Sequence, residues 1–419
     1  MDKHKYRQNK PQREQWYQDL AIGMYVYWTV DAQLGMVNAH SVIGASSDYL
    51  HRYFNDLPKT FNPKHFDAEY YARLAKSTGF DYVTIVAKNH NGFCNYNTKT
   101  TPFNVVNTPY GKDIVGDFVD ALRAYQLPIG MYFSPDDAWF QYKSGNQISR
   151  IRKEANPAHN ADLLKYDIAQ IDELMNLYGP IDIMCIDGSP GIGSKALIAQ
   201  RVWHKDPDTV ITRGGMPTPE QELTDEHGPF EAHFTIGNQW QYKGSNNSLK
   251  STTEIIELLL RVRSLGGTLL LAIGGPNPEG EMPEDLSGRL HDLGIWMFVN
   301  SEAVKNVRPW HVAKEKNVYF TKAKESDTVY ASVTGSPWKW GRRHEITLHG
   351  VRATQKTEIE ILGQSGEVLE YTHDTPSATW TQHERGLHIQ AVRAQRLYND
   401  LKWPHPVVLR ITHAQAVEP

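Results

Sequence analysis

Short apolar runs alternate with longer amphipathic stretches between residues 22 and 273 of this 419-residue chain. Short runs rich in β-branched side chains predict buried strands, whereas apolar positions three and four residues apart predict helices. The predicted strands are residues 22–29, 80–87, 128–133, 181–186, 210–212, 232–236 and 268–273. The predicted helices are residues 67–77, 114–125, 163–178 and 254–265. This alternation indicates an α/β fold with a parallel sheet covered by helices, and its many repeats favour a (β/α) TIM-like barrel over an open sheet.

The pattern changes after Trp310, where short strand-like runs replace the helices. These runs are VYFTKA, TVYASVT, HEITLHG, TEIEILG, GLHIQAV and VVLRITH, with turn-rich pieces such as GSPWKWGRR between them. Such spacing is typical of an antiparallel β-sandwich. We therefore predict a barrel domain at residues 1–312 and a β-sandwich domain at residues 313–419. We expect the sandwich to be a structural buttress rather than a carbohydrate-binding module.

Composition narrows the possible partners. The formal net charge of −4 argues against nucleic acid or an anionic membrane as the main partner, because both attract basic surfaces. Two cysteines, Cys94 and Cys185, are too few for a disulfide framework. The N-terminal stretch is charged and lacks the apolar segment of a leader, and no long apolar run follows. We expect a cytoplasmic protein without membrane contact.

Polar side chains close several predicted strands, at the ends where a (β/α) barrel carries its active site. The run IDIMCI ends in Asp187-Gly188, and a carboxylate at the end of a buried apolar strand needs partners or a function. An aspartate that caps the next helix would look the same, so the residues alone leave both interpretations open. Candidate groups near other strand ends are Tyr27, Trp28, Asn89, His90, Tyr132, Arg213, Glu220 and Glu231.

Paired carboxylates are the usual machinery for hydrolysis of a glycosidic bond. One attacks the anomeric carbon or activates water, and the other protonates the leaving oxygen. Asp187 with either Glu220 or Glu231 would make such a pair, so the pattern favours a barrel enzyme of the glycosidase type. The histidines of the barrel region show no tight spacing of metal ligands, and we expect no metal and no other cofactor.

Seven segments, in order along the chain, resemble the α-L-fucosidases of glycoside hydrolase family 29 from Trp16 to about Trp310. They are FNPKHFDAEYYARLAKSTGFDYVTIVAKNHNGF, TPYGKDIVGDFVDALRAYQLPIGMYFSPDDAW, ELMNLYGPIDIMCIDG, ITRGGMPTPEQE, FEAHFTIGNQWQY, GGTLLLAIGGPNPEGEMP and LGIWMFVNSEAV. The third is similar to the strand that carries the family's nucleophile. The fourth matches the family's segment in which an Arg is followed by Thr-Pro-Glu. The fifth is similar to the family's Trp-Glu strand.

The resemblance implies a retaining exo-α-L-fucosidase with a catalytic barrel and a covalent glycosyl-enzyme intermediate. It places the nucleophile on Asp187 and the acid/base on Glu220, with Glu231 as the alternative. His90 would contact fucose hydroxyls, and Arg213 would orient the nucleophile or the sugar. The substrate-binding residues implied in full are Tyr27, Trp28, Asn89, His90, Tyr132, Arg213 and Trp240. The expected substrates are short fucosylated oligosaccharides, with an α-1,3-linked fucosyl-N-acetylglucosamine unit as the first candidate.

Several positions depart from the family pattern. The family's His-Trp-Gly strand end is Tyr27-Trp28-Thr29 here, and its two adjacent histidines are Asn89 and His90. The Asp that follows them is Asn91, and a Trp common before the nucleophile is Cys185. Tyrosine and asparagine still form hydrogen bonds with hydroxyls, so a modified set of contacts could hold fucose. Two alternatives stay open: a retaining hydrolase of another sugar, such as an α-galactoside, and a non-catalytic fucose-binding barrel protein.

Overall fold

The computed structural model describes residues 8–35, 39–188, 192–224, 226–245, 247–397 and 402–417. The chain divides into two compact units, each drawn from three stretches. The first unit is Met1–Tyr17, Ile22–Leu249 and Leu270–Gly288, and the second is Gln18–Ala21, Lys250–Leu269 and Arg289–Pro419. The domain boundary at residues 312 and 313 stays a prediction.

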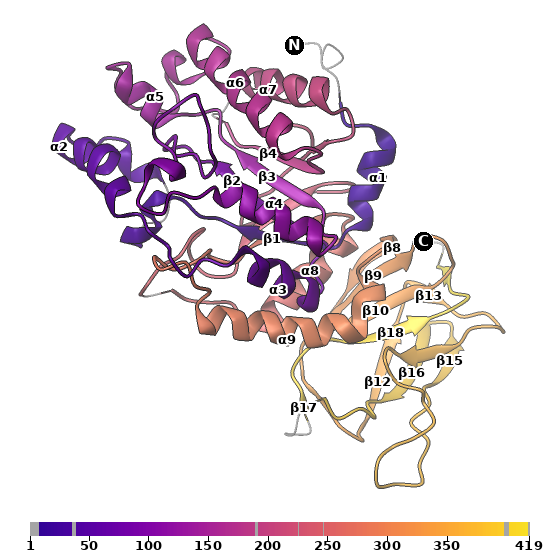
Figure 1. Cartoon of the computed structure of the whole chain (residues 1–419). Helices are drawn as coiled ribbons and strands as arrows, with labels where there is room; N and C mark the ends of the chain where they lie inside the picture. Colours follow the sequence, from indigo (N-terminus) through magenta and orange to yellow (C-terminus); the bar gives the residue numbers. More distant parts are fainter. Residues whose placement is uncertain are drawn as a thin grey trace. The chain divides into compact units, whose positions relative to one another are not determined.

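A seven-stranded sheet forms the centre of the first unit (Figure 1). Its strands are β1 (Ile22–Val26), β2 (Tyr82–Lys88), β3 (Ile129–Phe133), β4 (Ile183–Ile186), β5 (Val210–Ile211), β6 (Glu231–Thr235) and β7 (Thr268–Ala272). The strand order is β5-β4-β3-β2-β1-β7-β6, and the pairing from β1 to β5 is parallel. Every residue of these strands is buried, as expected for a sheet covered on both faces. The predicted TIM-like barrel is confirmed.

A short segment, residues 217–221, pairs with β6 on the side away from β7. The amides of Glu231 and His233 donate to the carbonyls of Pro217 and Pro219 at 3.1 and 2.9 Å. The amide of Gln221 donates back to the carbonyl of His233 at 2.9 Å. This pairing holds the loop after β5 against β6, and it brings Glu220 beside His233 in a parallel bridge.

The helices of the α/β region follow the strands along the chain. They are α1 (Pro11–Asp19), α2 (Ser47–His51), α3 (Ala68–Thr78), α4 (Ile114–Ala124), α5 (Ala138–Lys143), α6 (Ala161–Tyr178), α7 (Ile192–Lys205), α8 (Thr252–Ser264) and α9 (Glu284–Asn300). Side-chain caps begin several of them: Asp67, Asp113 and Asn160 each accept a hydrogen bond from a backbone amide of the first turn. The four predicted helices and seven predicted strands are all present, with ends shifted by a few residues. The pattern did not predict α1, α2, α5, α7 or α9.

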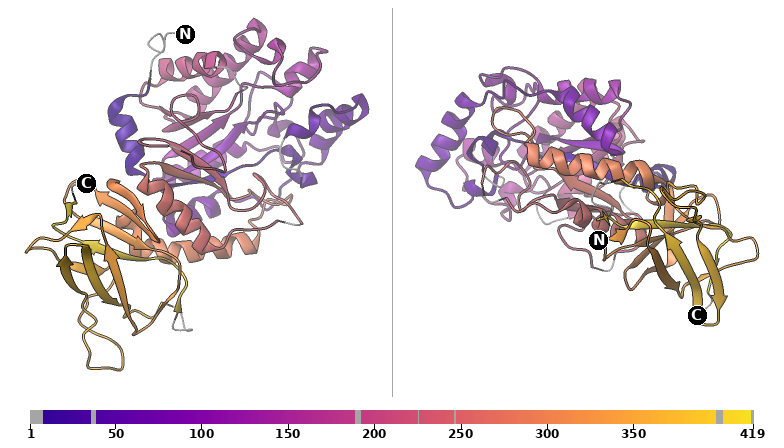
Figure 2. Two further views of the ribbon diagram at one scale, coloured as in Figure 1. Left: turned by 180° about the vertical axis from the view of Figure 1, so that it is seen from behind. Right: turned by 90° about the horizontal axis from the view of Figure 1, so that it is seen from below.

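Antiparallel sheets dominate the C-terminal part of the second unit (Figure 2). The strands are β8 (Val307–Glu315), β9 (Val318–Ala323), β10 (Val329–Val333), β11 (Trp338–Lys339), β12 (Arg343–Leu348), β13 (Val351–Arg352), β14 (Ile359–Ile361), β15 (Thr379–His383), β16 (Gly386–Val392), β17 (Lys402–Trp403), β18 (Val407–Ile411) and β19 (Gln415–Ala416). The larger sheets have the orders β14-β18-β10-β9-β8 and β12-β16-β15. The six predicted runs correspond to β9, β10, β12, β14, β16 and β18, which confirms the antiparallel C-terminal region.

A search of the described residues for a helix long and apolar enough to cross a membrane finds none. The predicted cytoplasmic location stays a prediction.

Candidate active site

Asp187 follows β4 directly and is the centre of a cluster of hydrogen-bond donors. Its Oδ2 accepts from the hydroxyl of Tyr132 at 2.8 Å and lies 3.3 Å from Nε2 of His90. Its Oδ1 lies 3.0 Å from Nη1 of Arg213. Tyr132 lies on β3, His90 follows β2 and Arg213 follows β5, so the parallel sheet brings all four residues together at the carboxyl ends of adjacent strands.

These donors control the charge of Asp187. Burial disfavours the carboxylate, but the hydrogen bond and charge of His90, together with the charge of Arg213, outweigh it. The pKa of Asp187 is therefore held well below its usual range. Its side chain is 15% exposed, so an ionised oxygen is reachable from solvent. An ionised, partly exposed carboxylate is what a nucleophilic role requires.

Arg213 joins Asp187 to a second carboxylate. Its Nη2 donates to Oε2 of Glu220 at 2.7 Å, and its Nε donates to the hydroxyl of Thr218 at 3.3 Å. One guanidinium therefore bridges Asp187 and Glu220, whose side chain is 44% exposed. Two carboxylates with different solvent access, held by one guanidinium, fit the paired arrangement of a glycosidase.

A cavity of about 530 Å³ opens over this cluster. Its lining residues are Tyr25, Tyr27, His40, His90, Tyr132, Arg150, Ile151, Asp187, Gly188, Lys195, Arg213, Glu220, His233 and Trp240. Seven predicted site residues are among them: Tyr27, His90, Tyr132, Asp187, Arg213, Glu220 and Trp240. Tyr25 and His233 could have been found from the sequence, since each lies two residues from a candidate on the same face of its strand. Arg150 lies between α5 and α6, Lys195 lies on α7, and no sequence pattern marked either residue.

Three predicted site residues do not line this cavity. Trp28 is buried and packs on Phe61 and Phe66, with ring centroids 5.7 and 5.1 Å away. Asn89 is also buried, and its Nδ2 donates to the hydroxyl of Tyr27 at 2.7 Å. Asn89 therefore orients a cavity residue instead of facing the cavity itself.

Glu231, the third, is fully buried on β6. Its Oε2 accepts from the hydroxyls of Tyr17 and Tyr82, the latter at 3.0 Å, and its Oε1 lies 2.6 Å from Nε2 of His233. Burial raises the pKa of Glu231, but the interaction with His233 and the hydrogen bonds from His233 and Tyr17 outweigh it and lower the pKa. Glu231 is an ionised group enclosed by its partners.

The family pattern's altered positions contact one another in pairs. Besides the Tyr27–Asn89 bond, Nδ2 of Asn91 donates to the hydroxyl of Thr29 at 2.9 Å. Asn91 also donates to the hydroxyl of Tyr53 at 3.0 Å. A change at the end of β1 is thus matched by a change after β2, and each altered side chain has a hydrogen-bond partner.

Residues 2–302 match the sequence model of the family described as alpha-L-fucosidase. The chain belongs to the α-L-fucosidase family. An α-L-fucosidase of Dictyostelium discoideum is 24% identical over 84% of this chain and 84% of its own. The tissue alpha-L-fucosidase of Rattus norvegicus is 25% identical over 86% of this chain and 83% of its own. The predicted family and the predicted enzyme class, glycoside hydrolase, are confirmed at this level.

Solved structures of α-L-fucosidases share the fold. A family 29 enzyme from Bacteroides thetaiotaomicron has a TM-score of 0.75 at 21% identity, covering 99% of this chain and 97% of its own. The Thermotoga maritima α-fucosidase in complex with fucose has a TM-score of 0.73 at 20% identity, covering 95% and 96%. A further structure of the Bacteroides enzyme is a covalent intermediate trapped with 2-fluoro-fucosyl fluoride by means of a Glu-to-Gln mutant.

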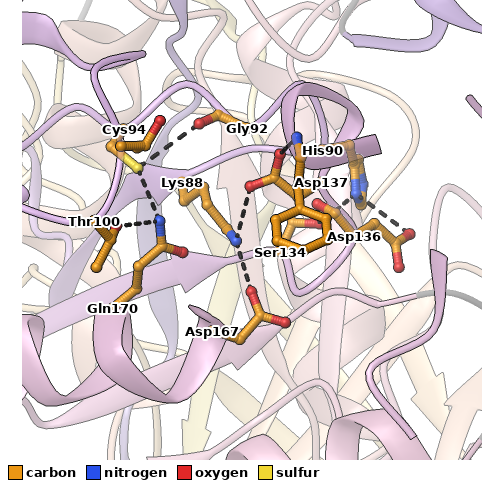
Figure 3. Close-up of polar contacts among 12 residues, drawn as sticks. Lys88, His90, Gly92, Cys94, Thr100, Ser134, Asp136, Asp137, Asp167 and Gln170 are labelled. Carbon is orange, nitrogen blue, oxygen red and sulfur yellow. Dashed lines mark hydrogen bonds and ion pairs between the residues drawn. The ribbon is translucent and has the colours of Figure 1, made fainter. Parts of the chain in front are cut away.

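His90 is held by a network on its far side (Figure 3). Its Nδ1 lies 2.5 Å from the hydroxyl of Ser134 and 3.7 Å from Oδ2 of Asp136. Asp136 in turn accepts from Nε of Arg150 at 2.8 Å, and Arg150 lines the cavity. Both ring nitrogens of His90 are therefore engaged, and its ring is fixed against Asp187.

One group of described residues has the composition of a metal site. Cys185, Glu231 and His233 bring one ligand atom each within 4.8 Å of one another. The oxygens of Glu231 already accept hydrogen bonds from His233 and two tyrosines, so this carboxylate has its partners within the protein. That no metal is needed stays a prediction.

Proposed function

We propose that this protein is a retaining exo-α-L-fucosidase with Asp187 as nucleophile and Glu220 as acid/base. The observation that carries the proposal is the bridged pair: an ionised Asp187 in the cavity wall and Glu220 held on the same guanidinium. Asp187 attacks the anomeric carbon while Glu220 protonates the leaving oxygen, and Glu220 then takes a proton from the water that hydrolyses the ester. The covalent intermediate trapped in the Bacteroides relative supports the same route here.

Glu220 is the better acid/base candidate because a proton donor must reach the leaving oxygen. Glu220 lines the cavity and is 44% exposed, so it can exchange protons with water. Glu231 is buried, and its two oxygens are occupied by Tyr17, Tyr82 and His233. Protonation of Glu231 would remove the negative charge that these three donors stabilise.

An aromatic wall supports a small sugar as the substrate. Tyr25, Tyr27, Tyr132 and Trp240 all line the cavity, and Tyr27 lies 5.8 Å from Tyr132 and 6.1 Å from Trp240 between ring centroids. Aromatic faces pack against the apolar face of a pyranose. His90 lines the same cavity and lies beside Asp187. The proposed substrates are short fucosylated oligosaccharides, and the α-1,3-linked fucosyl-N-acetylglucosamine unit is the first linkage to test.

The paired changes at Tyr27–Asn89 and Thr29–Asn91 favour a second candidate, a retaining hydrolase of another sugar. Of these residues, Tyr27 lines the proposed sugar cavity, and the contacts of Asp187 with Tyr132, His90 and Arg213 are retained. For the same reason hydrolysis is better supported than sugar binding without turnover, which would not require a carboxylate of depressed pKa.

The test is hydrolysis of 4-nitrophenyl α-L-fucoside, 4-nitrophenyl α-galactoside and fucosyl disaccharides of defined linkage, with an Asp187→Ala control. Release of fucose by the wild type alone supports the proposal and identifies the linkage. Turnover of the galactoside only would establish the second candidate. Binding of fucose without turnover of any compound would establish a non-catalytic protein.

A further inference from the structure

His233 lies between a buried carboxylate and the guanidinium that joins the two catalytic candidates. Its Nε2 is 2.6 Å from Oε1 of Glu231, and its Nδ1 is 3.4 Å from Nη2 of Arg213. Glu231 and His233 lie two residues apart on β6, so their side chains share one face of the strand. A continuous chain of contacts therefore runs from buried Glu231 through His233 and Arg213 to Asp187.

The direction of these hydrogen bonds follows from the chemistry of arginine. A guanidinium only donates, so Nδ1 of His233 must accept, and the ring proton must be on Nε2. Nε2 then donates to Glu231, which is ionised and acts as the acceptor. Both ring nitrogens are occupied, and neither is free for a sugar hydroxyl although the ring borders the cavity.

The contact with His233 completes the hydrogen bonding of Arg213. Nε of Arg213 donates to Thr218, Nη1 contacts Asp187, and Nη2 contacts both Glu220 and His233. The carboxylates and Thr218 lie around the cavity side, whereas His233 is anchored to the buried interior through Glu231. Glu231 is itself held by Tyr17 from α1 and Tyr82 from β2. The rigid sheet can thus set the orientation of the guanidinium plane.

We propose that His233, oriented by Glu231, is a positioning residue that fixes Arg213 between Asp187 and Glu220. The inference rests on the proposed function, because Arg213 joins the two proposed catalytic carboxylates. A retaining glycosidase needs its two carboxyl groups at a set separation. Displacement of catalytic groups by about 1 Å can cost about a hundredfold in rate, so a tilted guanidinium would lower turnover.

Two matched variants separate positioning from packing. His233→Asn places an amide oxygen near the position of Nδ1, keeping an acceptor for Arg213 and losing the reach to Glu231. His233→Gln places its amide near the position of Nε2, keeping the contact with Glu231 and losing the acceptor for Arg213. We expect His233→Gln to lower kcat on the fucoside about 10- to 100-fold with KM within about twofold. We expect His233→Asn to lose less than His233→Gln, because it keeps the acceptor for Arg213 and loses only the anchor at Glu231.

The outcomes are distinct. Equal losses in the two variants, or full kcat in His233→Gln, would overturn the positioning role. Thermal unfolding of each variant shows whether it folds. A second measurement does not need activity: ¹⁵N-histidine NMR of the wild type, assigned by difference from His233→Asn, should show the Nε2-protonated tautomer, and an Nδ1-protonated ring contradicts the inference. If the wild type shows the expected tautomer but no turnover, the proposed function is contradicted. The arrangement of Glu231, His233 and Arg213 is then still supported.

Discussion

Two clusters in the first unit have the same charges and different surroundings. In the proposed catalytic cluster, Arg213 contacts the carboxylates of Asp187 and Glu220 at 3.0 and 2.7 Å. In the interior cluster, Nζ of Lys88 lies 3.3 Å from Asp137 and 2.8 Å from Asp167, as Figure 3 shows. All three interior side chains are 0% exposed. Each cluster holds one cation between two carboxylates, so solvent access and donor geometry must account for any difference in role.

The interior cluster cannot neutralise both of its carboxylates with one ammonium. Burial raises the pKa of Asp167 to about 7, although the charge of Lys88 acts in the opposite direction. The pKa of Lys88 is raised as well, because its two carboxylates outweigh the effect of its burial. Asp137 also accepts the amide of Phe140 at 2.7 Å and so begins α5. This cluster ties β2, α5 and α6 together beneath His90, and we interpret it as structural.

The proposed catalytic cluster differs from the interior cluster in its cation. A guanidinium is planar and donates hydrogen bonds in several directions. Arg213 bonds both carboxylates through separate nitrogens, and the pKa of Asp187 falls where that of Asp167 rises. The comparison teaches that a cluster of this kind suits catalysis when its carboxylates are reachable from solvent, and is structural when it is dry.

The largest expected effect is the loss of turnover in Asp187→Gly. Removal of a nucleophile should lower kcat/KM on the fucoside by about 10⁴- to 10⁶-fold, and urea unfolding shows whether the variant still folds. Added azide should enter the vacated space and form fucosyl azide of inverted anomeric configuration, seen by NMR. Retained turnover without azide would remove Asp187 from its proposed role.

Glu220→Gln should produce a loss that depends on the leaving group. A general acid contributes about 10²- to 10⁴-fold when the leaving oxygen needs a proton, so hydrolysis of fucosyl disaccharides should fall by that factor. Hydrolysis of 2,4-dinitrophenyl fucoside should fall far less, because its leaving group departs as a stable anion. Glu231→Gln is the matched control and should affect both substrates equally; the reverse pattern would assign the acid/base to Glu231.

Lys88→Met should destabilise the fold, and Lys88 has no part in the proposed reaction. It leaves Asp137 and Asp167 buried without a cation, and breaking a buried pair typically costs about 3–5 kcal/mol in the free energy of unfolding. Lys59→Met, at the exposed Lys59–Asp56 pair, is the control and should change stability much less. Urea unfolding measures both, and equal changes would mean that burial does not set the role of the interior cluster.

The smallest expected effect is on the pH dependence of the free energy of unfolding. Its sign should be opposite for Asp167 in the interior cluster and Asp187 in the proposed catalytic cluster. The pKa of folded Asp167 is about 7, above the ordinary value of 3.8, so its protonated form stabilises the fold at low pH. This contribution is lost as the pH rises from about 4 to about 7. The free energy of unfolding of wild type minus that of Asp167→Asn should therefore decrease over this range.

Asp187 should behave in the reverse way. Its folded pKa is depressed, so its contribution to stability is present above the ordinary carboxyl range and is lost as the pH falls through the folded pKa. Urea titrations against the wild type measure both slopes, for Asp167→Asn between about pH 4 and about pH 7 and for Asp187→Asn below about pH 4. Parallel curves for the two variants would contradict the assignment of their charge states.

The sequence by itself determined the order of the secondary-structure elements and the candidate site residues. Alternating apolar runs predicted the seven strands, because a parallel sheet covered by helices buries its strands on both faces. Parallel strands also place their carboxyl ends at one edge, so Asp187, His90, Tyr132 and Arg213 could be expected together. The motif resemblance gave the family, which the comparison over residues 2–302 confirmed.

Only the tertiary structure showed that Glu220 and Glu231 have different surroundings. It also showed the position of His233 beside Arg213. A sequence pattern gives the face on which a side chain lies and does not give its depth or its neighbours from other strands. Glu231 is enclosed because tyrosines from α1 and β2 reach it, and Glu220 is open because residues 217–221 pair along β6. Both arrangements depend on contacts between residues far apart in the chain, and such distances are set by packing in three dimensions.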